Sequence, residues 1–327
     1  MTESDDRPPL LVLLGPTASG KTSLALDLAD QLPGGGELIG ADSMQIYRGM
    51  DVGTAKPTPA ERARAPHHLI DFVDPHHDRF TAHDWVTRAN ETIEDIHSRG
   101  KRPIVVGGTN LYVRGLLEGL LDGARPDPEL RARLETQDDR ALRSALEAAD
   151  PEAAERIHRN DRRRTIRALE VFELTGTPLS RQQVQWNDRV INPRFASRVI
   201  CLDWPTETLN QRINARVKAM ATSGFLEEVR TLGEQGPLSP QAAKAVGYEE
   251  LAAHLAGQST LEEAIERTKI RTRRFAKQQR TWMRRFHAVE GTLRLDPTEQ
   301  QPEQLVLAIL EWLGEQSGMS DKKKPGS

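Results

Sequence analysis

The chain has 327 residues, of which 28% are charged, 37% hydrophobic and 5% aromatic, with a formal net charge of −3. This composition is typical of a globular, helix-leaning protein and excludes collagen-like and fully disordered chains. The single cysteine, Cys201, argues against a disulfide framework and a cysteine-type zinc site. Residues 1–9 are polar and acidic, unlike a secretory signal, and no apolar stretch reaches the roughly 18 residues of a membrane span. We therefore expect a cytoplasmic protein.

The first elements form a strand, a glycine loop and a helix. Residues 10–14 are fully apolar, which predicts a strand buried on both faces of a parallel sheet. Residues 22–32 carry leucines at helical spacing and are followed by Pro33 and three glycines, which predicts a helix that ends there.

The loop between them satisfies the G-x-x-x-x-G-K-[ST] pattern with Gly15, Pro16, Thr17, Ala18, Ser19, Gly20, Lys21 and Thr22. In such a loop the backbone amides converge on phosphate oxygens, and the following helix adds its positive N-terminal end. We expect Lys21 to reach the outer phosphate and Thr22 to ligate Mg²⁺. A chance glycine loop is the alternative, and the strand before it and the helix after it argue against that. The motif predicts phosphate binding without identifying the ligand, and a kinase is the default interpretation.

The next segments continue the alternation of strands and helices. Strands are expected at 37–41 and 103–106, with a helix at 82–98 between them. Such alternation predicts a parallel sheet whose ligands lie at the carboxyl ends of its strands. Three residues fall at such ends, namely Gly15, Asp42 and Gly107.

After about residue 125 the pattern becomes almost continuously helical, which predicts an inserted all-helical subdomain at 125–196. One strand at 198–202 and helical segments at 206–233, 260–286 and 304–313 follow. We therefore predict an α/β fold, a P-loop NTPase-like parallel sheet flanked by helices. Its discontinuous catalytic core is formed by 1–124 and 197–315, and a disordered tail is expected at 316–327.

Further segments, taken with the glycine loop, carry a resemblance to one family. They are Ala-Asp-Ser-Met-Gln-Ile-Tyr at 41–47, Gly-Thr-Ala-Lys-Pro at 53–57, Val-Gly-Gly-Thr-Asn-Leu-Tyr at 106–112 and Ala-Val-Gly-Tyr at 245–248. In order and spacing the chain, up to about Leu295, resembles the bacterial tRNA dimethylallyltransferases, or tRNA isopentenyltransferases. The resemblance implies an enzyme that moves a dimethylallyl group from dimethylallyl diphosphate to N6 of the adenosine 3′ of the anticodon, at tRNA position 37. Diphosphate is released and no ATP is consumed. Mg²⁺ is expected from the glycine loop, and nothing in the sequence suggests more than a monomer.

The chemistry of this reaction suggests roles for several residues. An adenine amine is a poor nucleophile because its lone pair is delocalised into the ring, so a carboxylate that accepts its proton lowers the barrier. Asp42, at the end of the second strand, is the candidate general base, while Lys21, Mg²⁺ and the loop amides hold the charge of the leaving group. The resemblance adds Arg230 at the diphosphate and Thr109 near the reacting centre. Without the resemblance, Asp42 could be a helix cap and the glycines before Thr109 a tight turn.

The adenine must leave the stack of the anticodon loop to reach a buried diphosphate, so we expect it to be flipped outward. Basic residues of the helical insertion and of the helix at 260–286 are candidates for contacts with RNA phosphates, although a solvated helix face is the alternative. The implied tRNA contacts are Asp42, Ser43, Met44, Gln45, Thr109, Arg163, Arg164, Arg167, Lys244, Gly247, Tyr248, Lys277, Arg280 and Arg284.

Two other functions stay open at this point, a nucleotide-dependent small-molecule kinase and a non-enzymatic P-loop RNA-binding module. A metal site among the histidines at 67, 68, 76, 77 and 83 is disfavoured, because no thiolate accompanies them and their spacing matches no zinc template.

Overall fold

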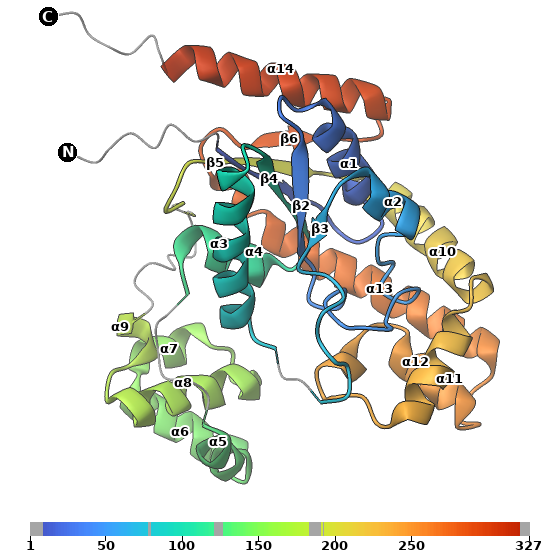
Figure 1. Ribbon diagram of the computed structural model, residues 1–327. Coiled ribbons are helices and arrows are strands. Elements are labelled where there is room, and N and C mark those ends of the chain that lie inside the picture. The colour runs from blue at the N-terminus through green and yellow to red at the C-terminus, as the bar shows by residue number, and fades with distance from the viewer. Residues whose placement is uncertain (1–8, 78–79, 121–126, 183–190, 192, 321–327) are drawn as a thin grey trace, which may run out of the picture. The chain divides into compact units, whose positions relative to one another are not determined.

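The computed structural model describes residues 9–77, 80–120, 127–182, 191 and 193–320 (Figure 1). The chain forms two compact units, Met1–Leu117 together with Val190–Ser327, and Glu118–Arg189. Within the described residues, no helix is long and apolar enough to cross a membrane.

The larger unit is built on a six-stranded sheet in the order β3-β2-β4-β1-β5-β6, with every neighbouring pair parallel. Its strands are β1 (Leu10–Leu14), β2 (Gly36–Ala41), β3 (His67–His68), β4 (Arg102–Gly107), β5 (Ser197–Leu202) and β6 (Leu293–Leu295). The predicted parallel α/β sheet flanked by helices is thus confirmed. The two edge strands, β3 and β6, are too short to leave an alternating pattern and were not predicted.

The strand register brings three loops to one edge of the sheet. Gly107 at the end of β4 is opposite both Leu14 at the end of β1 and Ala41 at the end of β2. The glycine loop, the segment after β2 and the segment after β4 therefore begin side by side, as expected for ligand-binding loops of a parallel sheet.

The described part of the larger unit contains nine α-helices. They are α1 (Lys21–Gln31), α2 (Pro59–Arg64), α3 (Ala82–Ser98), α4 (Asn110–Glu118), α10 (Thr206–Thr222), α11 (Phe225–Gln235), α12 (Tyr248–Leu255), α13 (Leu261–Met283) and α14 (Pro302–Ser320). Capping boxes begin α3 at Thr81 and α13 at Thr260, which fixes their first turns. Gly224, at φ 94°, separates α10 from α11 in a conformation that favours glycine. The tail expected to be disordered from 316 is helical up to Ser320, and 321–327 lie outside the described residues.

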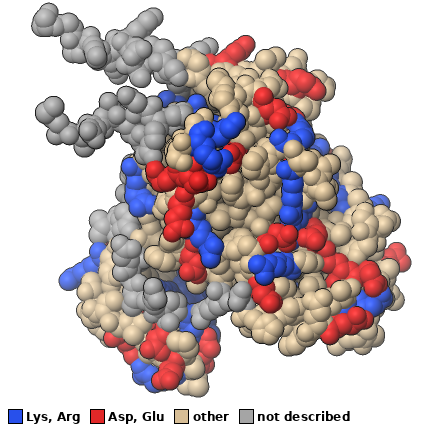
Figure 2. Space-filling model, in the orientation of Figure 1, with Lys and Arg blue, Asp and Glu red and all other residues tan. Residues whose placement is uncertain are grey.

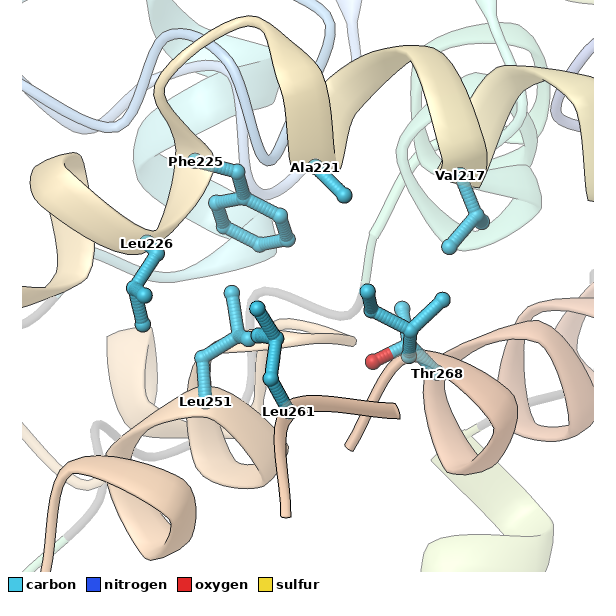
Figure 3. A pocket seen from close by; sticks show the side chains of 8 residues that line it. Val217, Ala221, Phe225, Leu226, Leu251, Leu261 and Thr268 are labelled. Atoms are coloured by element: carbon cyan, nitrogen blue, oxygen red, sulfur yellow. The ribbon is translucent and has the colours of Figure 1, made fainter. Parts of the chain in front are cut away.

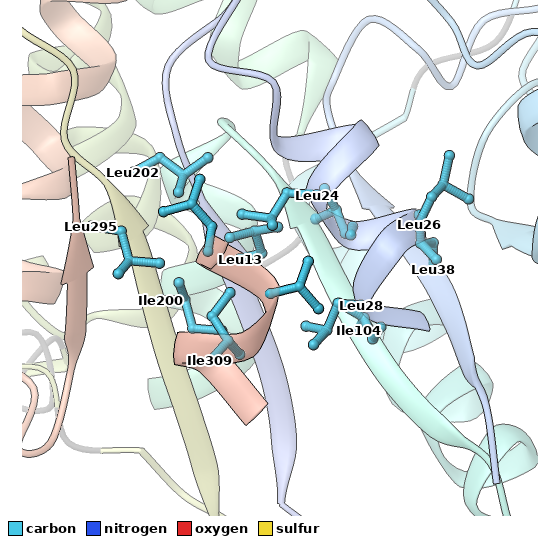
Figure 4. Close-up of a cluster of buried hydrophobic side chains, with 14 of the residues drawn as sticks. Leu13, Leu24, Leu26, Leu28, Leu38, Ile104, Ile200, Leu202, Leu295 and Ile309 are labelled. Carbon is cyan, nitrogen blue, oxygen red and sulfur yellow. The ribbon is translucent and has the colours of Figure 1, made fainter. Parts of the chain in front are cut away.

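The main core lies between one face of the sheet and α1, α10 and α14 (Figure 4). Alternate residues of β1, Leu11 and Leu13, point into this cluster with Ile104 of β4 and Ile200 of β5. Because successive side chains of a strand point to opposite faces, the intervening residues of β1 face the other layer, and they are buried as well. Burial on both faces explains the continuous apolar runs of the central strands.

The smaller unit is entirely helical in its described residues, with α5 (Pro128–Glu135), α6 (Asp139–Ala149), α7 (Pro151–Arg156), α8 (Arg162–Thr175) and α9 (Leu179–Gln182). The first four of these helices begin at an aspartate whose side chain accepts a hydrogen bond from the first turn. Leu134, Leu142, Leu146 and Leu169 belong to its separate apolar core.

Candidate active site

The glycine loop is held in place through its carbonyl groups. Ala18 and Gly20 adopt positive φ values of 63° and 82°. The Trp204 indole donates to the Ser19 carbonyl at 2.9 Å, and the Arg212 guanidinium donates to the Ala18 carbonyl at 2.8 Å. Because the C=O and N–H groups of one trans peptide point in opposite directions, anchoring the Ser19 carbonyl turns the Gly20 amide the other way. The Gly20 amide therefore points away from Trp204, while the Ser19 amide donates to the Pro16 carbonyl at 3.2 Å.

Lys21 brings a cationic group to this loop. Its Nζ lies 3.4 Å from the Pro16 carbonyl oxygen, which it bonds as donor. Burial lowers the pKa of Lys21 to about 8, with the carboxylate of Asp42 opposing and the guanidinium of Arg216 assisting the change. Burial also lowers the pKa of Arg216, again against the attraction of Asp42. Lys21 and Arg216 are two positive charges that interact with the single carboxylate of Asp42. A bound anion would stabilise the charged forms of both cations.

Arg216 of α10, rather than the expected Arg230, is the arginine whose charge acts on Lys21. Arg230 is exposed on α11, where its guanidinium pairs with Glu227 one turn earlier, and no contact with the glycine loop is found for it among the described residues. Arg212 and Arg216 are four residues apart on α10 and so share a helix face. Sequence reasoning missed both, although the spacing of arginines in the helix before Gly224 was a usable signal.

The segments after β2 and β4 are packed together at the edge of the sheet. The Thr109 amide donates to the Ala41 carbonyl at 3.0 Å, and the Thr109 hydroxyl accepts from the Ser43 amide at 3.0 Å. A Cβ at Gly107 would lie 2.1 Å from the Ala41 oxygen, so only glycine permits this approach. The predicted pair Asp42 and Thr109 is thereby brought together.

The half-buried Asp42 side chain has one oxygen in use and one available. Its Oδ1 accepts from the Met44 amide at 2.9 Å in a tight turn, and no regular helix starts at Ser43, so Asp42 is not a helix cap. No hydrogen bond to Oδ2 is found among the described residues. A carboxylate fixed through one oxygen can accept a proton with the other.

The segment 42–45, expected to contact the adenine, is held by hydrogen bonds to the motif at 53–57. The Gln45 side-chain amide donates to the carbonyls of Thr54 and Ala55, both at 3.1 Å. Lys56 is buried and donates to the Tyr47 carbonyl at 2.6 Å while pairing with Asp51 and Asp71. Both N–H groups of Gln45 are thus occupied, and no partner of its Oε1 is found among the described residues.

Two expected tRNA contacts near α12 are packing residues instead. The Tyr248 side chain is 1% exposed, and its hydroxyl donates to Glu228 Oε1 at 2.6 Å. Gly247 is buried at φ 98°, and a Cβ there would meet the Phe225 ring at 2.6 Å. The structure therefore does not support direct RNA contacts by their side chains, whereas Lys244 is exposed nearby in sequence.

The basic residues of α13 differ in their availability. Lys277 and Arg284 are exposed without an ion-pair partner among the described residues. Arg280 donates to the Thr206 hydroxyl at 2.5 Å, and Lys269 and Arg271 are engaged by acids. Basic and acidic side chains are interspersed on the face seen in Figure 2. Of these basic residues of α13, Lys277 and Arg284 are thus the most accessible to a ligand.

The arginines of α8 show a similar division within the smaller unit. Arg163 is exposed, and no partner is found for it in the described part of the chain. Arg164 is exposed and pairs with Asp161 at 3.4 Å. Arg167 is half-buried and bonds Glu170, a fully buried carboxylate, at 2.8 Å. Arg163 is therefore the most available of the three.

The residues present are compatible with a Mg²⁺ that arrives with a phosphate ligand. Thr22 lies in the first turn of α1, and its hydroxyl bonds no described residue. No cluster of three or more His, Cys, Asp or Glu is found in the described chain, including around the histidines at 67–83. Mg²⁺ commonly uses one or two protein ligands and completes its shell with water and substrate phosphates, so this sparse donor set fits it.

An apolar pocket lies between α10, α11, α12 and α13, where Val217, Phe225, Leu251 and Leu261 point toward one another (Figure 3). Its volume of about 10 Å³ accommodates one water molecule at most. It is too small for a prenyl chain.

A parallel sheet with a glycine loop, Lys21 and an unengaged threonine hydroxyl after its central strand defines a phosphate-binding protein of the P-loop class. The family described as IPP transferase matches residues 45–286. This chain belongs to that family.

Individual relatives agree with this assignment. The chain is 46% identical over 283 residues to tRNA dimethylallyltransferase 1 of Citrifermentans bemidjiense, covering 86% of this chain and 91% of the relative. It is 47% identical over 287 residues to the tRNA dimethylallyltransferase of Geobacter sulfurreducens, covering 86% and 90%.

Solved structures give the same result. The full-length tRNA isopentenylpyrophosphate transferase of Bacillus halodurans superimposes with a TM-score of 0.68 at 37% identity, covering 96% of this chain and all of that one. A eukaryotic dimethylallyltransferase acting on tRNA gives a TM-score of 0.76 at 32% identity, covering 88% and 74%.

Proposed function

We propose that this chain transfers the dimethylallyl group of dimethylallyl diphosphate to N6 of adenosine 37 of tRNA, giving N6-isopentenyladenosine and diphosphate. The observation that carries the proposal is the gathering of Lys21, Asp42 and Arg216 at the glycine loop. Cations that hold a diphosphate beside a carboxylate that can take a proton are what this transfer needs.

In the proposed reaction the bond from the prenyl C1 to the diphosphate oxygen breaks as the bond from C1 to adenine N6 forms. The electron pair of the broken bond goes to the leaving diphosphate. The loop amides, Lys21 and Arg216 are already in place around that charge, so little reorganisation is needed as it develops.

The proton released by N6 goes to Asp42 Oδ2. The turn that Oδ1 forms with the Met44 amide sets the direction of the carboxylate, and the Thr109 hydroxyl fixes the neighbouring Ser43 amide. Thr109 thus acts by shaping the segment that meets the adenine. Thr109, which follows β4, therefore influences the general base Asp42, which follows β2.

Thr22 would hold a Mg²⁺ that arrives with the diphosphate. When bound, this ion would neutralise phosphate charge. Asp42 is left for the proton, because the protein needs to supply no further acidic ligand.

For tRNA we propose that the flipped adenine meets the segment Asp42, Ser43, Met44 and Gln45. Lys244, Lys277, Arg280 and Arg284, together with Arg163, Arg164 and Arg167 of the smaller unit, contact RNA phosphates. A tRNA substrate places the enzyme in the cytoplasm, and we propose that it acts as a monomer.

The test is transfer of label from radioactive dimethylallyl diphosphate to unmodified tRNA, with ATP hydrolysis measured in parallel. Label in a wild-type anticodon stem-loop, and none in one with guanosine at position 37, is the expected result. ATP turnover without label in RNA would support the kinase alternative. RNA binding with neither activity would support a binding module.

A further inference from the structure

Gln279 of α13 is a buried polar residue at the glycine loop that the reaction described above does not use. Its side chain is 6% exposed. Its Oε1 accepts from the Thr17 amide at 2.8 Å, and its Nε2 donates to the Gly108 carbonyl at 3.1 Å. One side-chain amide, 262 residues from Thr17 in sequence, thus joins the glycine loop to the segment after β4.

The position of this side chain is fixed from two further directions. A Cβ at Gly108 would lie 2.2 Å from Gln279 Nε2, so the amide is seated directly against a glycine. The Asn110 side chain donates to the Gln279 backbone carbonyl at 3.3 Å, which holds α13 at the same point. Rotation of the Gln279 side chain would break its hydrogen bonds to both loops.

The amide that Gln279 occupies belongs to the phosphate loop itself. Loops of this sequence bind phosphates through successive backbone N–H groups, and those of nucleotide-hydrolysing proteins accommodate three phosphates. Here the Thr17 N–H is already taken, and the Gln279 side chain fills the space in front of it. The Ser19 amide donates to the Pro16 carbonyl at 3.2 Å within the loop, whereas no partner is found among the described residues for the Ala18 and Gly20 amides. Those two amides and the N-terminal turn of α1 remain available.

We propose that Gln279 closes the Thr17 end of the phosphate loop and makes it selective for a diphosphate over a triphosphate. The inference rests on the proposed function, because it explains how a loop typical of NTPases would serve a prenyl diphosphate. A third phosphate would have to displace a buried side-chain amide, which would lose both of its hydrogen bonds and leave the Gly108 carbonyl with only the 3.4 Å bond from Asn110. The loss of buried hydrogen bonds is a recognised basis of discrimination.

The test measures binding of inorganic pyrophosphate and inorganic tripolyphosphate to the full chain by calorimetry, with Mg²⁺ at fixed excess. The wild type is expected to prefer pyrophosphate by at least about tenfold, the scale of one charge-assisted hydrogen bond. Gln279→Ala should reduce that preference about tenfold. Gln278→Ala, which changes the exposed neighbouring glutamine, is the matched control and should leave the preference unchanged.

Gln279→Asn provides a second variant, because its shorter amide cannot reach both Thr17 and Gly108. It should shift the preference in the same direction, and it decides the matter if thermal melting shows that the alanine variant does not fold. A preference within about twofold of wild type in the folded variant overturns the role of Gln279. A wild-type chain that prefers tripolyphosphate would instead contradict the diphosphate assignment, and neither measurement depends on prenyl transfer.

Discussion

The lowered pKa of Lys21 makes diphosphate binding depend on pH in a range where an ordinary lysine would not titrate. The ammonium form binds the anion, and its pKa in the free protein is about 8 instead of the usual 10.5. Lys21 is therefore mostly protonated at pH 7 and mostly neutral at pH 9. Affinity for pyrophosphate should be full below pH 8 and fall about tenfold for each pH unit above it.

Calorimetric dissociation constants for pyrophosphate at pH 7, 8 and 9, at fixed free Mg²⁺, measure this effect. Lys21→Arg is the control, because a guanidinium stays protonated throughout the range while the ionisation of pyrophosphate itself is unchanged. Dividing the wild-type constants by those of the arginine variant should leave a roughly tenfold loss of affinity between pH 7 and 9. A flat ratio would refute the inference that Lys21 is a desolvated cation beside Arg216.

Three further predictions concern packing and RNA binding. Tyr248→Phe removes the hydrogen bond to Glu228 and should lower the free energy of unfolding by about 1–3 kcal/mol in denaturant titrations. Its tRNA affinity should stay within about twofold of wild type, and a large selective loss of tRNA binding would show that the tyrosine contacts RNA. Replacing Lys277 and Arg284 together by alanine should reduce the slope of log affinity for tRNA against log salt by about one per cation; an unchanged slope would place the RNA elsewhere. Gly107→Ala should cost about 2 kcal/mol or more of stability, because a backbone oxygen occupies the space of the new Cβ, and an unaltered melting temperature would contradict the close approach of β2 and β4.

The central sheet and the glycine loop could be predicted because their signals are local. The apolar run at Leu10–Leu14, buried on both faces, and the helix pattern of Ala82–Ser98 each reflect neighbours along the chain. The convergence of the segments after β1, β2 and β4 followed from the topology of a parallel sheet. The edge strands β3 and β6 could not be predicted, because two or three residues are too few for periodicity.

The residues that sequence reasoning missed or misplaced depend on tertiary contacts. The charge that acts on Lys21 belongs to Arg216 of α10, whereas Arg230 of α11 is paired with Glu227. Tyr248 follows a conspicuous glycine, yet its ring packs at 5.1 Å from that of Phe225 inside the unit. Gln279 lies in a basic helix and carries no local sequence signal for a contact with Thr17, which is distant in the sequence.

The account depends most on the proton acceptor beside the diphosphate. Asp42→Asn keeps the size of the side chain and can keep the turn with the Met44 amide, but it cannot accept the N6 proton. With tRNA and dimethylallyl diphosphate both saturating, its single-turnover rate of label transfer should fall about 10²- to 10⁴-fold, the usual contribution of a general base, while tRNA and pyrophosphate binding stay near wild type. A rate within a few fold of wild type, with both substrates bound, would contradict the account.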